Sequence, residues 1–226
     1  MQRVDCGDSG FKEGGFVAGG EIPYGALVAR SAEGKVKATP TGDTDLGFIG
    51  VALDDEVENR DNPGFYSADT PTPIKVSGPA KFWLMGGKTV QSGDYLKMAA
   101  TIGAGTEPIG ALGPESTKDV RTVKTVARVF GDEETGDVGS ADYDQTLESD
   151  ATGGEKEIEL TEAKISSMDL VVGDYVVLDD NNAGEINRVA KIDGEFVTLQ
   201  NAMANSYTTA AAATLYKLVQ VKAVFV

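Results

Sequence analysis

Paired carboxylates are the residues of this chain whose type and spacing could do chemistry. Asp54 and Asp55 follow one apolar run, and Asp179 and Asp180 follow another. Two carboxyl groups that flank a glycosidic bond could act as acid and base in a polysaccharide hydrolase. Both pairs, however, lie at predicted strand ends beside turn residues, where Asp is favoured because its side chain hydrogen-bonds the local backbone. We therefore predict no catalytic residue.

Acidic residues also alternate over 142–148 in the manner of a calcium-binding loop. The sixth position of that loop would be Leu147, where a glycine is needed, and the twelfth would be Gly153, where a bidentate glutamate belongs. The sequence therefore predicts a solvated acidic loop and no metal site, with a bound cation as the alternative.

The chain has no histidine and a single cysteine, Cys6. The lack of histidine removes the usual general base, the commonest zinc ligand and the physiological pH switch. One thiol cannot form an internal disulfide or a thiolate cluster, and the neighbouring Asp5 and Asp8 disfavour its thiolate. Neither a phosphate-binding loop nor a dinucleotide-binding fingerprint occurs. We predict that the protein is not an enzyme and has no cofactor.

Composition indicates an all-β protein. The 226 residues include 28 glycines, few aromatic residues and no long stretch with helical periodicity. A net charge of −16 disfavours binding to nucleic acid or to an anionic membrane. The sequence shows no signal-peptide pattern and no membrane span, so we expect the chain to be made and folded in a cytoplasm.

A recurring unit organises the chain: an apolar approach, a glycine, an apolar strand, a polar turn and a return strand. The first copy spans 22–54. The second opens at 90–98 and closes at 109–112, and the third opens at 170–178 and closes at 186–192. The glycine allows a bulge or a positive φ where the chain enters the strand, and alternation buries one face. The pattern predicts barrel-forming hairpins within separate modules.

These signals predict four segments. Residues 1–20 form an extended arm, and 21–130 form a β-barrel or sandwich of eight short strands. Residues 131–156 are acidic and glycine-rich, which is typical of a linker or a long exposed loop. Residues 157–226 form a small SH3-like or OB-like β-barrel with a hairpin turn at Asp193 and Gly194.

The predicted arm carries Phe11, Phe16 and Val17 among six glycines. It is either a disordered tail or an arm that docks on a neighbouring subunit, and in the second case these three residues would be its contacts. Since it has too little apolar content to fold alone, we expect its removal to leave the fold intact. Trp83, the only tryptophan, is expected to pack in the core rather than to form a ligand platform.

Two stretches resemble a known family. IGVALDD at 49–55 and TPIKVSGPAKFWL at 72–84 resemble the capsid decoration (cement) proteins of tailed bacterial and archaeal viruses. The resemblance covers roughly residues 20–130. The C-terminal part, with VGDYVVL at 172–178 and GEINRV at 184–189, looks like the small β-domains appended to virion structural proteins.

The resemblance implies a virion protein that binds the outer surface of an expanded HK97-like shell and stabilises it. It implies the major capsid protein as partner, a homo-oligomer with a trimer favoured, and no membrane or nucleic acid. By position, residues 1–20 would lie along the shell, with Phe11, Phe16 and Val17 in contact. The alternatives are a tail, fibre or host-surface-binding β-protein and, third, a polysaccharide hydrolase.

Overall fold

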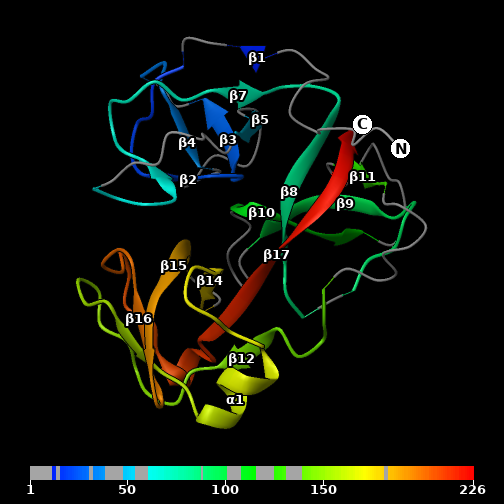
Figure 1. Cartoon of the computed structure of the whole chain (residues 1–226). Helices are drawn as coiled ribbons and strands as arrows, with labels where there is room; N and C mark the ends of the chain where they lie inside the picture. Colours follow the sequence, from blue (N-terminus) through cyan, green and yellow to red (C-terminus); the bar gives the residue numbers. More distant parts are fainter. Residues whose placement is uncertain are drawn as a thin grey trace.

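The chain is all-β, as its composition predicts (Figure 1). Among the described residues it has one short helix, α1 (Glu162–Ser167), and one 3-10 turn, η1 (Thr209–Ala211). No described helix is long and apolar enough to cross a membrane. The computed structural model describes residues 12–13, 16–30, 33–38, 48–53, 61–87, 89–100, 108–115, 125–130, 139–180 and 183–226.

The first barrel is a sheet in the order β1-β7-β5-β3-β4, closed by residues 16–19. Ala18 of this segment bridges Val36 in parallel, and Val17 bridges Pro71 in the antiparallel direction, so the segment joins β4 to the chain that leads into β7. The pair β2 and β6 lies beside it. The strands are β1 (Lys12–Glu13), β2 (Ile22–Pro23), β3 (Leu27–Arg30), β4 (Val36–Ala38), β5 (Phe48–Ala52), β6 (Phe65–Tyr66) and β7 (Ile74–Lys75).

The second barrel closes through five strands. β9 is antiparallel to both β10 and β11, β10 is parallel to β8, and β17 is antiparallel to both β8 and β11. Phe82, Leu84 and Leu96 are fully buried inside it. The strands are β8 (Pro79–Met85), β9 (Tyr95–Ala100), β10 (Pro108–Glu115), β11 (Thr125–Val129) and β17 (Thr214–Phe225).

The third barrel follows the order β17-β14-β15-β16-β13. It closes because β12 pairs with β17 on one side, while the N–H of Glu148, just after β12, donates to the carbonyl oxygen of Glu159 in β13. Leu160, Met168 and Tyr207 are fully buried in its core. The strands are β12 (Asp144–Thr146), β13 (Glu157–Glu159), β14 (Tyr175–Asp179), β15 (Gly184–Asp193) and β16 (Phe196–Leu199).

One strand belongs to two barrels. Residues 214–217 of β17 pair with β14, and residues 218–224 pair with β8. The strand runs diagonally through the molecule in Figure 1. Val221 and Ala223 are buried in the second barrel, so residues 218–224 belong to that barrel, although the sequence predicted a separate C-terminal barrel over 157–226. The second and third barrels therefore share one sheet.

The observed segments differ from the predicted ones in two further ways. Residues 16–130 build most of two barrels rather than one, with the division near Gly78. Residues 139–156 are not a linker: they contain β12, and the side chains of Leu147 and Ala151 are buried in the third barrel. Acidic composition hid this strand because β12 itself contains no apolar residue, and the buried Leu147 comes directly after it.

Candidate functional site

Each barrel contains one copy of the repeated unit, and each copy turns into its first strand at a glycine with positive φ. The φ values are 78° at Gly25, 100° at Gly93 and 99° at Gly173, which confirms the predicted need for glycine. In each copy the glycine N–H donates to the carbonyl oxygen of a return strand at 2.9 Å; the acceptors are Ala52, Val129 and Val189. We call these three turns the glycine corners.

The corner of the third barrel is reinforced by side chains. Asp174 accepts a hydrogen bond of 2.9 Å from the N–H of Val171 and lies 3.0 Å from the ammonium group of Lys217. Arg188 Nε donates to the carbonyl oxygen of Gly173 at 3.0 Å, and its guanidinium group lies over the ring of Tyr175 at 5.7 Å. The arginine thus holds the corner and the aromatic ring that follows it.

The corner of the second barrel repeats this arrangement. Asp94 accepts from the N–H of Gln91 at 2.8 Å, Arg128 Nε donates to the carbonyl oxygen of Gly93 at 3.0 Å, and the guanidinium group lies 5.4 Å from the Tyr95 ring. Residues 109–112, the return strand expected from the sequence, lie in β10, which pairs with β9 in the antiparallel direction. The carbonyl oxygen that accepts from the Gly93 N–H belongs instead to β11, which pairs with the other side of β9.

The first barrel keeps only the backbone part of the corner. Ala26 and Leu27 stand where the other two copies have Asp and Tyr. The backbone bonds are nevertheless the same, since Ala52 N–H donates to the carbonyl oxygen of Ala26 at 2.9 Å.

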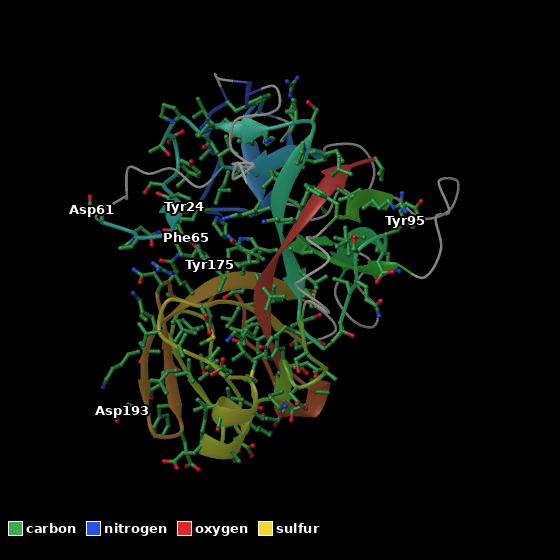
Figure 2. The ribbon with its side chains drawn as sticks, turned by 45° about the vertical axis from the view of Figure 1, so that its right-hand side comes forward. Tyr24, Asp61, Phe65, Tyr95, Tyr175 and Asp193 are labelled. Atoms are coloured by element: carbon green, nitrogen blue, oxygen red, sulfur yellow. The ribbon has the colours of Figure 1, made fainter. Side chains whose placement is uncertain are left out.

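The third corner also joins the three barrels. Tyr175 Oη donates to the carbonyl oxygen of Gly64 at 2.6 Å, and Arg188 Nη1 donates to that of Pro63 at 3.1 Å, so both side chains bind the first barrel. Trp83 of the second barrel donates through Nε1 to the carbonyl oxygen of Tyr24 at 2.6 Å, and its rings lie 4.8 Å from that of Tyr175. Figure 2 shows Tyr24, Phe65 and Tyr175 meeting between the barrels.

An apolar cluster fills this junction. Phe65, Met85, Val177, Tyr216 and Leu218 are buried there, and the half-buried Trp83 packs against them, which agrees with the expectation that Trp83 has a packing role. A Cβ at Gly64 would lie 2.3 Å from Tyr175 Oη, and one at Gly25 would lie 2.5 Å from Trp83 Nε1. Glycine at both positions allows the backbone of the first barrel to approach its neighbours.

Two of the three predicted arm contacts lie within the first barrel. Phe16 packs against its core beneath the guanidinium group of Arg30, and Val17 forms a bridge to Pro71. Phe11 lies outside the described residues. The arm therefore docks on its own chain over residues 16–19, where Ala18 is fully buried. In contrast to the expectation from the sequence, we now expect removal of this part to destabilise the fold.

Of the two predicted carboxylate pairs, only Asp179 and Asp180 lie among the described residues. Asp54, Asp55 and Cys6 lie outside the described residues. Asp180 accepts a hydrogen bond of 3.0 Å from the N–H of Ala183, the local turn bond expected of an aspartate at a strand end. Among the described residues, no three His, Cys, Asp or Glu side chains are grouped so that they could hold a metal ion.

Sequence reasoning missed two neighbouring polar side chains in the third barrel, the partly buried Glu185 and the fully buried Tyr207. Glu185 of β15 accepts a hydrogen bond of 2.8 Å from the N–H of Ala204, and burial raises the pKa of its carboxyl group. Burial and the charge of Glu185 raise the pKa of the neighbouring Tyr207, which has no exposed surface. Tyr207 lies in the loop before β17, where no local pattern signals burial.

No protein-family model, curated protein or solved structure matches this chain. The functional argument therefore depends on the geometry of the chain itself. Arg188, Tyr175 and the glycine corner between them hold the barrels of this chain together through hydrogen bonds and ring contacts.

Proposed function

We propose that the protein is a virion structural protein that binds the outer surface of the mature capsid and stabilises it as a decoration, or cement, protein. The observation that carries the proposal is the path of the N-terminal segment. Lys12 pairs with Lys75 and Val17 bridges Pro71, so the described residues 12–13 and 16–19 are held on the first barrel. In the proposal, the preceding residues 1–11, including Phe11, reach the shell from this fixed point.

The barrel junction supports the same proposal. A body whose parts are held by Tyr175, Trp83 and Arg188 loses little conformational freedom when it binds a second surface, and this lowers the cost of association. A ligand that binds only the mature shell stabilises it by its binding free energy, repeated at many symmetric positions. The acidic chain, at net charge −16, would keep coated particles soluble.

The proposed partner is the major capsid protein, with a homotrimer as the favoured assembly. No enzymatic step is part of this role. A polysaccharide hydrolase gains no support from Asp180, whose carboxylate is engaged in the turn after β14. A tail, fibre or host-surface protein would use the same kind of rigid β-structure. It would differ from a decoration protein in the number of copies per virus particle.

Co-sedimentation with expanded, undecorated capsids of the virus that encodes the chain tests the proposal. We expect saturation at a fixed multiple of the capsomer number. A variant that lacks residues 1–11 should remain folded and bind more weakly, because the first described strand pairing begins at Lys12. A handful of copies per particle would indicate a tail component. No binding to shells that accept a known decoration protein would overturn the proposal.

A further inference from the structure

The second and third barrels have similar glycine corners. The corner of the third barrel binds the first barrel, whereas the corner of the second barrel lies at the surface. Arg188 binds its own corner through Nε and reaches Pro63 through Nη1. Arg128 makes the same Nε bond to Gly93, yet its side chain is exposed, and no described residue accepts a hydrogen bond from its terminal nitrogens. The corner of the second barrel therefore resembles one that binds a neighbouring barrel, but its arginine side chain is exposed to solvent.

Two exposed lysines lie on the strands next to Arg128, on the same face of the second barrel. Lys81 of β8 lies directly opposite Lys222 of β17, and both side chains are exposed. Arg128 lies opposite Val224, two residues further along β17 on the same face. Like charges directly opposite each other are destabilising, and neither ammonium group pairs with a carboxylate of the described residues. We call Lys81, Arg128 and Lys222 the basic stripe.

The basic stripe lies in a region of the chain that carries a net positive charge. Residues 79–130 contain seven basic and four acidic residues, a net charge of +3, although the whole chain carries −16. Residues 139–216, which form most of the third barrel, contain fifteen acidic and four basic residues, a net charge of −11. The chain therefore carries both the positively charged stripe and a negatively charged region that can attract it.

The third barrel carries an exposed aromatic residue set among carboxylates. Phe196 is 45% exposed and pairs in register with Glu159 of β13 on one side and with Asp193 of β15 on the other. Glu157 and Glu195 are exposed close by, and Asp193 forms an ion pair of 2.7 Å with the exposed Lys191. An aromatic centre with a charged rim is typical of protein–protein interfaces. We call Phe196 and its four acidic neighbours the acidic tip.

We propose that the basic stripe of one copy binds the acidic tip of a second copy, head to tail. Figure 2 shows Tyr95, beside Arg128, and Asp193 of the tip on opposite sides of the molecule, so the two patches of one copy face different neighbours. Such a heterologous contact, repeated by rotation, builds a ring. Arg128 supplies the fork geometry that binds a carboxylate, and the lysines supply point charges. The contact does not depend on the capsid proposal, because it requires no shell.

Sedimentation velocity of the full chain in about 0.15 M salt tests the proposal. We expect the wild type to associate and Lys81→Glu/Lys222→Glu to dissociate at least about tenfold more readily, because two attractions become repulsions. The matched control is Arg30→Glu/Lys37→Glu, which changes net charge equally at exposed positions of the first barrel. It should associate as the wild type does.

A charge exchange makes the test specific to the two patches. Glu157→Lys/Glu159→Lys should also dissociate, and the variant with all four substitutions should associate again, since each patch then faces the opposite charge. Circular dichroism confirms that each variant is folded. A monomeric wild type, unchanged association of either double variant, or failure of the fourfold variant to recover would overturn the proposal. Capsid binding by the same variants is measured separately, so the two proposals can fail independently.

Discussion

The hydroxyl group of Tyr175 donates a 2.6 Å hydrogen bond to the carbonyl oxygen of Gly64, a residue 111 positions earlier in the chain. The bond joins the third barrel to the first without any covalent connection nearby. Gly64 has a φ of 88° and no side chain, and both properties allow the tyrosine to approach its backbone. The arrangement of the barrels can therefore be tested at this one contact.

Tyr175→Phe should lower the free energy of unfolding by about 0.5–1.5 kcal/mol, because the buried carbonyl group of Gly64 loses one of its two donors and keeps the N–H of Tyr24 at 3.0 Å. Urea denaturation measures the change. The matched control is Tyr143→Phe, since no described residue shares a hydrogen bond with the Tyr143 hydroxyl group, and it should have the stability of the wild type. Equal effects of the two substitutions would show that the junction bond contributes nothing.

Gly64→Ala should cost more than Gly154→Ala. Both glycines have φ near 90°, at 88° and 91°, so each alanine carries a similar backbone strain of about 1–2 kcal/mol. Only at Gly64 does the added Cβ meet Tyr175, because nothing lies within 4 Å of the corresponding position at Gly154. We expect a difference of at least about 1.5 kcal/mol in unfolding free energy. A difference near zero would show that the junction relaxes freely.

Truncation separates the two parts of the N-terminal segment. Removal of residues 1–11 should leave the unfolding free energy unchanged. Removal of residues 1–19 should lower it by about 2–3 kcal/mol or more, because the segment that joins β4 to Pro71 is lost together with the buried Ala18. Thermal unfolding of the two proteins compares them directly, and equal midpoints would contradict the closure of the first barrel by this segment.

Glu185→Gln should make stability less dependent on pH. Burial raises the pKa of Glu185 in the folded state, so the folded protein holds this proton more tightly than the unfolded chain. That stabilisation is complete below the unfolded pKa and is lost as pH rises through the folded pKa. The variant should therefore be more stable than the wild type at about pH 7, with the difference disappearing near pH 4. Urea titrations at both pH values measure it.

Asp150→Asn should change the stability at neutral pH in the opposite direction to Glu185→Gln. Hydrogen bonds from the backbone N–H and the hydroxyl group of Thr209, at 2.7 and 2.9 Å, lower the pKa of Asp150. Its stabilisation is present above the unfolded pKa and is lost as pH falls through the folded pKa. The variant should be less stable than the wild type at neutral pH and approach it in acid. If both substitutions changed the stability at neutral pH in the same direction, burial of Glu185 and the hydrogen bonds to Asp150 would not be the causes.

Local patterns in the sequence predicted the local geometry well. A glycine that allows a bulge or a positive φ was expected before the first strand of each unit, and Gly25, Gly93 and Gly173 all have a positive φ. The all-β class followed from glycine, β-branched residues and alternation. These features depend on a few neighbouring residues, so a single sequence contains the information.

The choice of partner strand could not be read in the same way. The alternation over 218–226 fits any half-buried strand, and nothing within it indicates that β8 and β11 are its neighbours. Arg128 and Arg188 stand as single arginines in strands, and their equivalence emerges only when each is seen bound to a glycine corner. The basic stripe was hidden for a related reason, because net charge averages over three barrels.

Because β17 belongs to two barrels and comes after all their other strands in the chain, neither barrel can be completed until this strand has been synthesised. β8 to β11 leave the ribosome well before residues 214–225, and at about 5–20 residues per second the second barrel waits roughly 4–17 s for its missing strand. Until then β8 and β11 each lack their β17 neighbour, and such an open edge can pair with another chain. When β17 emerges, it completes the second and third barrels together. A nascent chain that stalls before residue 214 would therefore leave two barrels open and become a substrate for chaperones or proteases.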